Sequence, residues 1–484
     1  MFKGMFSEKE IKEKLLELKE IDRDMYEYIL NEKIKFNKFK VLKKTFEQTI
    51  KRYLARIIGF QNIPVKEYLT KFIEEYQKRL TVTDLINRIN SPSHKKKILY
   101  VTSSPTFNMV RQSIYLRKNG YETILLMERN LSLTGFYEKY FDVVFVFSSI
   151  YTLYYILKKA KPYLVHVQGT TRNANHFGIL AKLFSNSKVV FNFYDIPSTT
   201  ITEDEIATAG SLVGGEKVIE LDLFSEKFAC ERCDGLIFGY TAKVGEILKN
   251  RYNINVPMLE FNSYPCDEFI SEKSYKYPGR DGKVHLVYGG NVAPSRLPEK
   301  YFGDCQFHSL IDKLTRQDIY FDIFVMDASL RRIKRDYGDY LLMSEENPFF
   351  NFKQGMILEN ATREFSKYDF GMMVYDFYKG TFHKGTRIME EHIPMRLADK
   401  FFTYLEAGLP ILISEELRYG AMLVKEYEMG IVVSHQDLDN LSGIIKSYDR
   451  EKLKDNVKRA REDLSMKRHI GRLITFYEQI VENK

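Results

Sequence analysis

The feature that most constrains the fold is an alternation of short apolar runs with helix-length segments, which occurs twice along the chain. The first pass begins near residue 97, and the pattern restarts at "KVHLVYGGNV", residues 283–292. Continuous apolar strands that alternate with helices are typical of a parallel sheet covered on both faces. Strands of the first pass are expected at 98–102, 122–127, 143–147, 164–168, 189–193 and 235–238. The sequence therefore predicts an α/β chain with two doubly wound, Rossmann-like domains that face a cleft.

Changes in composition mark where the domains begin and end. The predicted units are a helical N-terminal extension (1–94), a first Rossmann-like domain (95–265) and a second one (266–465). The segment "SPSHKKK", 91–97, reads as a linker, and so does the Pro-, Gly- and Ser-rich stretch 259–283. A last helix, 466–484, is expected to complete the first domain.

The N-terminal extension contains a basic amphipathic pattern at residues 33–58. This segment has nine basic residues and one acidic residue, Glu47, with apolar residues at helical spacing. Such a helix can pack its apolar face on the protein, or it can lie on an anionic membrane surface. The formal charge of +8 suits anionic partners but does not choose among them. No base-stacking motif is present, so nucleic acid is not expected as a partner.

The sequence carries only weak signals for targeting and for metal binding. The charged opening "MFKGMFSEKEIKEKL" is unlike a signal peptide, and no long uncharged apolar window predicts a membrane span. Cys230 and Cys233 form "CERC" without a second ligand pair, so buried thiols are a better interpretation than zinc. We expect a cytoplasmic protein, with peripheral contact at the inner face of the membrane through residues 33–58, and no metal.

A charged pair stands on a predicted helix within "RLADKFFTYLEAGLPILIS", residues 396–414. Lys400 lies at the helix start and Glu406 near its end, and both positions oppose the preference of the helix dipole. A bound diphosphate for Lys400 and a pair of sugar hydroxyls for Glu406 would account for this placement. The alternative is that both are solvated surface charges.

This stretch resembles the donor-site signature of GT-B glycosyltransferases, in particular family 4-like enzymes. The agreement covers Lys400, Phe401, Phe402, Tyr404, Ala407, Gly408, Pro410 and Ile411. The resemblance implies that Lys400 and Tyr404 belong to the donor site and that Glu406 holds the ribose of the nucleotide. In the first acidic position of the motif this chain has Ala398, and Thr403 stands where an acidic residue often precedes the Tyr.

The resemblance extends from about residue 97 to the end of the chain. In "PYLVHVQGTTRNANHFGILAKLFSNSKVVFNFYD", His166 and Gln168 take two family His positions, and Tyr194-Asp195 a later pair. "LVYGGNVAPSR" resembles the turn that opens the donor domain. It implies that Gly289, Gly290 and Asn291 approach the donor and that Arg296 binds its diphosphate. His383 and Arg387 lie in a polar segment, 382–396, that is also expected near the donor.

The resemblance implies a hexosyltransferase-like enzyme that moves a sugar from a nucleotide-sugar donor to a glycan, lipid-linked or protein acceptor. It implies catalytic roles for Lys400, Arg296, His166 and Gln168, retention of configuration, and no cofactor or metal. The first Rossmann-like domain would bind the acceptor and the second the donor. Two alternatives stay open, a non-catalytic nucleotide-sugar-binding or scaffold protein with this fold and a non-hydrolysing sugar-nucleotide epimerase.

Overall fold

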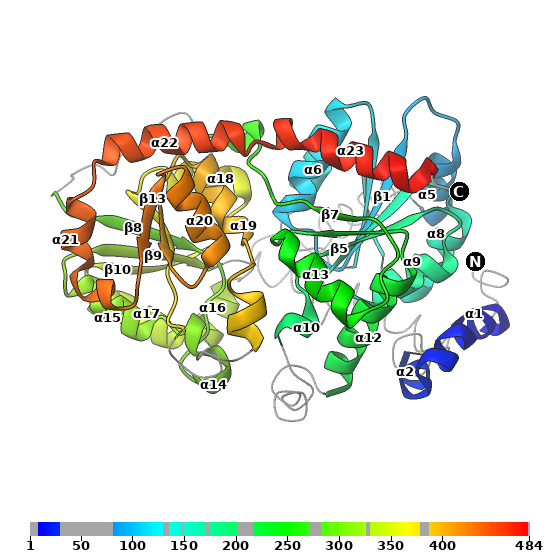
Figure 1. Ribbon diagram of the computed structural model, residues 1–484, viewed down its shortest axis with the longest axis horizontal. Helices are drawn as coiled ribbons and strands as arrows, with labels where there is room; N and C mark the ends of the chain where they lie inside the picture. The colour runs from blue at the N-terminus through cyan, green and yellow to red at the C-terminus, as the bar shows by residue number, and fades with distance from the viewer. Residues whose placement is uncertain are drawn as a thin grey trace, which may run out of the picture.

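Two parallel β-sheets, each flanked by helices, form the molecule (Figure 1). The structure, a computed structural model, describes residues 8–29, 81–128, 135–147, 149–170, 175–200, 216–271, 282–297, 299–325, 330–377 and 387–482. The predicted α/β fold with two Rossmann-like domains is confirmed by these sheets.

The first sheet has seven strands in the order β3-β2-β1-β4-β5-β6-β7, and all neighbouring strands are parallel. Its strands are β1 (Lys97–Thr102), β2 (Glu122–Met127), β3 (Val143–Val146), β4 (Leu164–Gly169), β5 (Val189–Phe193), β6 (Gly235–Phe238) and β7 (Met258–Glu260). The order reverses direction between β1 and β4, and ligands of such sheets bind beside this point, at the carboxyl ends of the strands.

The second sheet has six parallel strands in the order β10-β9-β8-β11-β12-β13. Its strands are β8 (His285–Gly289), β9 (Tyr320–Val325), β10 (Phe350–Gln354), β11 (Phe370–Met373), β12 (Ile411–Ser414) and β13 (Gly430–Val433). Here the order reverses between β8 and β11. Strand β10 was not predicted, because this edge strand carries the polar residues Asn351, Lys353 and Gln354 and lacks a continuous apolar run.

Helices cover both sheets. Those before β8 are α1 (Glu8–Ile21), α2 (Arg23–Tyr28), α5 (Val82–Asn90), α6 (Phe107–Lys118), α7 (Tyr137–Tyr140), α8 (Ile150–Lys159), α9 (His176–Phe184), α10 (Pro197–Thr200), α12 (Glu216–Arg232), α13 (Ala242–Arg251) and the 3₁₀-helix η2 (Asp267–Phe269). Those after β8 are α14 (Glu299–Phe302), η3 (Gly303–Cys305), α15 (His308–Thr315), α16 (Leu330–Asp336), α17 (Gly338–Glu346), α18 (Leu358–Phe365), the π-helix η5 (Ile388–His392), α19 (Asp399–Glu406), α20 (Arg418–Glu426), η6 (Gln436–Asn440), α21 (Leu441–Lys446), α22 (Arg450–Asp463) and α23 (Met466–Glu482).

The last two helices run along one side of the molecule, α22 over the second domain and α23 over the first (Figure 1). A Cβ on Gly235 of β6 would lie 2.6 Å from Ile480 Cδ1 and 2.9 Å from Phe476 Cζ, so α23 packs closely on the first sheet. The chain therefore returns to its first domain at the C-terminus.

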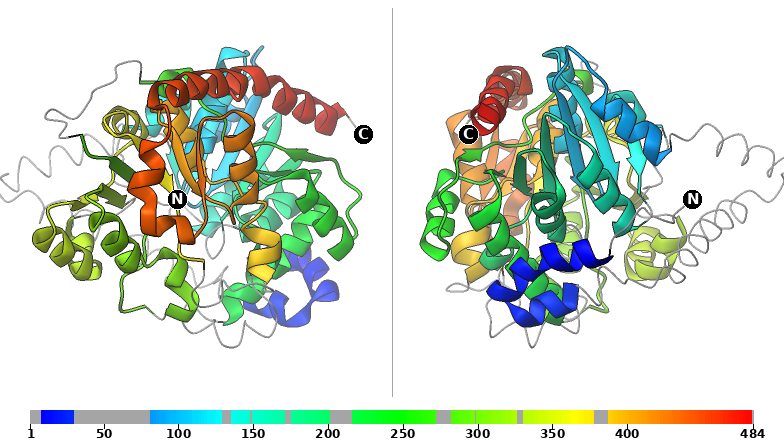
Figure 2. Two further views of the ribbon diagram at one scale, coloured as in Figure 1. Left: turned by 60° about the vertical axis from the view of Figure 1, so that its left-hand side comes forward. Right: turned by 90° about the vertical axis from the view of Figure 1, so that its right-hand side faces the viewer.

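The described part of the N-terminal extension packs against the first domain, near α12 (Figure 2). Leu15, Leu18, Met25 and Tyr26 are buried, and Lys14 Nζ donates to Leu183 O at 2.9 Å. The predicted basic helix at 33–58 lies outside the described residues. None of the described helices has both the length and the apolar composition that crossing a bilayer requires.

A buried ion pair joins the two domains. Arg111 of α6 binds Glu406 of α19 through both carboxylate oxygens, at 2.8 Å and 2.6 Å, and neither side chain is exposed to solvent (0%). The guanidinium also donates to Thr403 Oγ1 at 3.0 Å. The backbone N–H of Cys266, in the segment between the domains, donates to Glu406 at 2.9 Å. The pair therefore connects α6, the inter-domain segment and α19.

We expect Arg111→Ala to destabilise the protein by about 3–5 kcal/mol, because it leaves the Glu406 carboxylate buried without its cation. Urea unfolding should show a lower midpoint. The control is Arg88→Ala, which removes an ion pair with Glu122 whose Arg side chain is 46% exposed. That change should cost at most about 1 kcal/mol. Equal losses in the two variants would contradict a special role for the buried pair.

Candidate active site

Lys400 reaches the point where the strand order of the second sheet reverses. The end of β8 leads into Gly289 and Gly290, and Tyr375 follows the neighbouring strand β11. The Lys400 ammonium donates to the Tyr375 hydroxyl at 3.0 Å and lies 3.8 Å from the centroid of the Tyr288 ring. A Cβ on Gly290 would come within 2.6 Å of Lys400 Nζ, so a side chain there would displace the lysine. The predicted turn and the predicted lysine thus meet.

The Lys400 ammonium has no anionic partner within the described residues. Its neighbours are two phenols, and no described carboxylate lies within 4.0 Å. Burial lowers the pKa of Lys400 to about 7, and the positive charge of Arg396 adds to this shift. Asp304 and the Cys305 thiol act in the opposite direction. A positively charged side chain that is held without a counter-ion in a partly buried site is suited to an anionic ligand.

The turn after α19 explains the Gly and Pro of the motif. Gly408 has φ +70, and the backbone N–H groups of Gly408 and Leu409 donate to Leu405 and Tyr404 carbonyls at 3.0 and 2.9 Å. This is a Schellman cap, which ends the helix with a glycine in the left-handed conformation. Pro410 follows and β12 begins at Ile411. The cap sets the direction in which the chain enters the sheet.

Tyr404 is hydrogen-bonded to the glycine turn. Its hydroxyl accepts from the Gly289 N–H at 3.1 Å and donates to Met372 O at 3.2 Å, and its ring is buried. Tyr404 therefore joins β8, β11 and α19 at the switch point. Its predicted role in donor binding is indirect in this geometry, since no part of the side chain is accessible.

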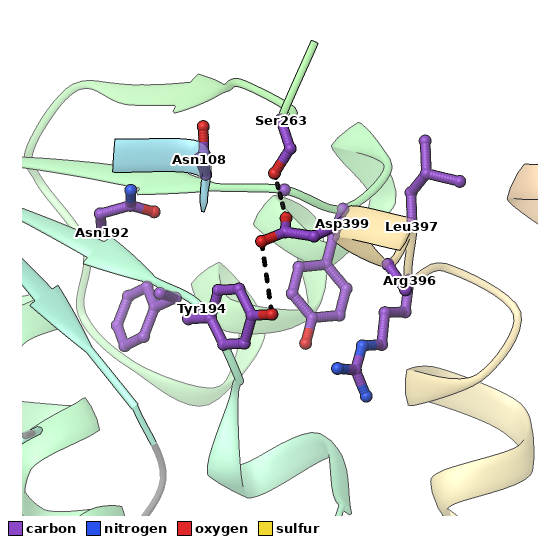
Figure 3. Close-up of a pocket in the computed structure, with 11 residues that line it drawn as sticks. Asn108, Asn192, Tyr194, Ser263, Arg396, Leu397 and Asp399 are labelled. Atoms are coloured by element: carbon purple, nitrogen blue, oxygen red, sulfur yellow. Dashed lines mark hydrogen bonds between the residues drawn. The ribbon is translucent and has the colours of Figure 1, made fainter. Parts of the chain in front are cut away.

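A small cavity lies between the two domains (Figure 3). The ends of β5 and β6, the start of α6, the inter-domain segment and the residues before α19 line it. Its volume of about 20 Å³ is enough for a water molecule.

The lining of this cavity is polar and contains charged groups from both domains. Asp399 accepts hydrogen bonds from the Ser263 hydroxyl and, at 3.5 Å, from the Tyr194 hydroxyl (Figure 3). Burial raises the pKa of Asp399, and the Arg111 guanidinium opposes the shift. Arg396 lies 3.5 Å from Asp195 of the first domain. The Tyr194-Asp195 pair named by the resemblance thus lies at the inter-domain boundary.

The structure gives Glu406 a different partner from the predicted ribose. Both of its carboxylate oxygens are bonded to Arg111, and the side chain is fully buried. A ribose hydroxyl would have to displace the guanidinium and open the domain interface. The unfavourable position of Glu406 at the helix end is explained by this ion pair, not by an open binding site.

The predicted catalytic His166 and Gln168 lie inside the first domain. His166 is on β4, with Nδ1 2.5 Å from the Tyr477 hydroxyl of α23, and burial lowers its pKa to about 3. The imidazole is enclosed by Tyr100 and Tyr477, and this geometry gives no support to a catalytic role. Gln168 is also buried and accepts from the Thr106 hydroxyl at 3.1 Å. Its amide points to the loop after β1.

The other predicted donor residues do not gather at Lys400. Arg296 is 61% exposed and pairs with Asp336 of α16 at 3.3 Å, and the Asn291 side chain is exposed. Arg387 donates to Ser198 O of α10 at 3.3 Å, so it contacts the first domain. His383 lies outside the described residues. The catalytic and diphosphate-binding roles of Arg296 therefore lack support in this geometry.

Sequence reasoning missed four residues of the site, Arg111, Tyr375, Arg396 and Asp399. Arg396 and Asp399 stand within the stretch that was singled out, but no matching motif position marked them. Tyr375 lies two residues after the end of β11, a position at which the switch-point rule expects ligand contacts. For Arg111, nothing in the neighbouring sequence signals a partner 295 residues away.

We expect the Lys400→Met variant to have a higher Tm than the wild type at about pH 6. Near pH 10 the two proteins should have the same Tm. The folded-state pKa near 7 lies below the unfolded value, so the cost of the buried charge is present below about pH 7 and fades as pH rises toward 10.5. A gain of about 2 °C or more in Tm is expected at the lower pH. Lys182→Met, which removes a cation paired with Asp234 at 2.7 Å, should instead lower Tm. A pH-independent difference for Lys400→Met would contradict the shifted pKa.

One comparison with known proteins finds a similarity in the second domain. Residues 335–475 match the family model of the glucosyltransferase 3-like, C-terminal domain. This segment begins before α17 and includes Lys400, Arg396 and Glu406. It covers less than half of the chain. No protein with curated annotation matches the sequence.

Solved structures with a similar course of the chain share little sequence. Thermobaculum terrenum O-GlcNAc transferase has 11% identity, with 81% of this chain and 69% of that chain covered and a TM-score of 0.48. Burkholderia multivorans α,α-trehalose 6-phosphate synthase has 9% identity, with 80% and 99% covered and a TM-score of 0.49. An Arabidopsis thaliana protein in complex with UDP-L-rhamnose has 12% identity, with 80% and 100% covered and a TM-score of 0.43. These scores are too low to support an argument about this chain. The family model and the two parallel sheets confirm the prediction of a glycosyltransferase with two Rossmann-like domains.

Proposed function

We propose that the protein transfers a hexose from a nucleotide-sugar donor to a hydroxyl of a glycan, lipid-linked or protein acceptor. The observation that carries the proposal is the Lys400 ammonium, held beside the Gly289–Gly290 turn without a described carboxylate partner. The family model supports the same reading, because its description is that of a glucosyltransferase. Glucose is therefore the first sugar to test.

The proposed chemistry needs positive charge where the leaving group forms. When the bond between the anomeric carbon and the phosphate oxygen breaks, the electron pair and the negative charge move to the diphosphate. A protonated Lys400 stabilises that charge, and a partly buried site strengthens the interaction. The glycine turn lets a phosphate come close because neither residue carries a side chain, while its own N–H groups are already bonded, that of Gly289 to the Tyr404 hydroxyl and that of Gly290 to Phe324 O.

The first domain would supply the acceptor site and close over the donor. In this proposal the domains open to admit the substrates and close again over them. Closure would exclude water, which would otherwise hydrolyse the donor. In this proposal the Arg111–Glu406 pair forms part of the closed state.

We also propose that the reaction retains the anomeric configuration and needs no metal or cofactor. These two points rest on the sequence resemblance alone. Proton NMR of the fresh product would report the anomeric configuration. Transfer that persists in excess chelator would support a reaction without metal. Loss of transfer in chelator, restored by Mg²⁺ or Mn²⁺, would overturn that part of the proposal.

Peripheral contact with an anionic membrane, at the inner face in a cytoplasmic protein, is proposed for residues 33–58. We expect sedimentation with phosphatidylglycerol vesicles to decrease when Lys40, Lys43, Lys44 and Lys51 are changed to Gln together, since each basic residue near the surface contributes about 1 kcal/mol. Phosphatidylcholine vesicles are the control for the lipid charge. Equal sedimentation of the variant and the wild type would refute the membrane contact.

We expect a sugar nucleotide to raise the Tm of the wild type, because a ligand that binds only the folded state stabilises it by mass action. UDP-, GDP-, CMP- and dTDP-sugars are compared by thermal shift, beginning with UDP-glucose. Lys400→Ala should weaken binding of the active donor at least about tenfold, equivalent to ~1.4 kcal/mol. Lys182→Ala, on the surface of the first domain, is the matched control.

The outcomes separate the alternatives. Binding and turnover with the same nucleotide support the transferase. Binding without turnover with any acceptor class would favour the non-catalytic binding protein, and conversion of the donor to its epimer would favour the epimerase. Absence of any shift would contradict the proposal.

A further inference from the structure

Arg396 stands at the boundary between the two domains. Its backbone forms an antiparallel bridge with Tyr240, which follows β6 of the first domain. The adjacent Met395 carbonyl accepts from the Thr241 N–H at 3.1 Å. These contacts fix the chain three residues before α19 begins, so the guanidinium is placed at the wall of the inter-domain cavity (Figure 3).

The guanidinium of Arg396 is only loosely bound. Its contact with Asp195 is 3.5 Å long, and a second contact, with Nε2 of His392, is 3.4 Å long. Burial and the charge of Arg396 itself lower the pKa of His392, so this partner is a neutral imidazole. The Arg396 side chain is 35% exposed, whereas Arg111 is fully buried and bonded at 2.6 Å. A guanidinium has five N–H donors, and most of those of Arg396 are not used by these contacts.

Three carboxyl groups and three tyrosines lie around Arg396. Asp195 comes from the first domain, Asp304 from η3 and Asp399 from α19, and the tyrosines 194, 240 and 375 lie nearby. Burial raises the pKa of Asp304 to about 6 and also raises that of Asp399. Both carboxyl groups are therefore ionised less readily, and they compete less strongly with an anionic ligand for the guanidinium.

Lys400 is the second cation of this neighbourhood. Arg396 is close enough for its charge to contribute to the lowered pKa of Lys400. Two cations that repel each other, one of them without a described counter-ion, are electrostatically unfavourable until an anion binds between or beside them.

We propose that Arg396 is the second diphosphate-binding cation of the donor site, acting with Lys400 in place of Arg296. This inference rests on the proposed function and adds a residue that no motif marks. The planar fork of a guanidinium binds two phosphate oxygens at once, whereas the ammonium of Lys400 acts as a point charge. Together they would hold the diphosphate at the carboxyl ends of β8 and β11.

The contact of Arg396 with Asp195 also bears on where the donor lies. The backbone of Arg396 is bridged to Tyr240 of the first domain. If its guanidinium binds the diphosphate, the donor phosphates come to lie against the first domain. Arg396 would therefore place the leaving group at the boundary where the acceptor is expected. Arg296, on the far side of the glycine turn beside Asp336, has no such contact among those described.

The test compares Arg396→Gln with Arg296→Gln by calorimetric titration. UDP, GDP and dTDP are titrated into the wild type, and the tightest is used for the variants, with the matching nucleoside as a phosphate-free control. We expect Arg396→Gln to weaken the nucleoside diphosphate at least tenfold and the nucleoside less than twofold. Arg296→Gln should change neither by more than about twofold, as expected for an exposed surface ion pair.

Arg396→Lys keeps the charge without the fork and should give an intermediate loss. Arg396→Lys also replaces Arg396→Gln as the test variant if the latter fails to fold, which circular dichroism would report. Equal affinity of the wild type and both Arg396 variants would overturn the inference and leave the proposed function intact. A loss with Arg296→Gln instead would return the role to that residue. Absence of binding to the wild type would overturn the proposed function itself.

Discussion

The ion pair between Arg111 and Glu406 is the interaction on which the relative position of the two domains depends. It is fully buried, bidentate and extended to Thr403 and to the backbone of Cys266. Removing two charges from water is costly, and only good geometry and further hydrogen bonds offset that cost. The pair is therefore satisfied in one arrangement of α6 against α19. Further contacts between the two domains are the hydrogen bonds of Tyr115 with Asp267 and of Thr199 with His392.

Helix α19 connects this interface to the candidate donor site. Its first turn carries Asp399 and Lys400, and its last residue is Glu406. Tyr404, between them, bonds to β8 and β11. One short helix thus contacts the first domain at both ends and the switch point of the second sheet in its middle. A movement of the domains relative to each other would therefore break the contacts that Glu406 and Asp399 of this helix make with Arg111 and Tyr194.

The sequence was sufficient for the fold because parallel strands buried on both faces are continuous apolar runs. The predicted strands 122–127, 189–193 and 235–238 agree with β2, β5 and β6 to the residue. The sequence brings Lys400 and the glycine turn together, since they lie at helix and strand ends whose positions the pattern determines. The contacts of Glu406, His166 and Arg296 could not be predicted, because a polar residue in a motif does not reveal its partner. Arg111, Tyr477 and Asp336 decide their roles, and these partners are 295, 311 and 40 residues away.

The lowered pKa of Lys400 has a thermodynamic consequence for any anion that binds there. Near neutral pH the amine is charged in only part of the molecules, because its pKa is about 7. An anionic ligand favours the charged form, so binding draws a proton from the solution. The heat measured on binding then includes the ionisation heat of the buffer and differs between phosphate and Tris. The occupancy of the site at a fixed ligand concentration accordingly follows the acidity of the surrounding solution.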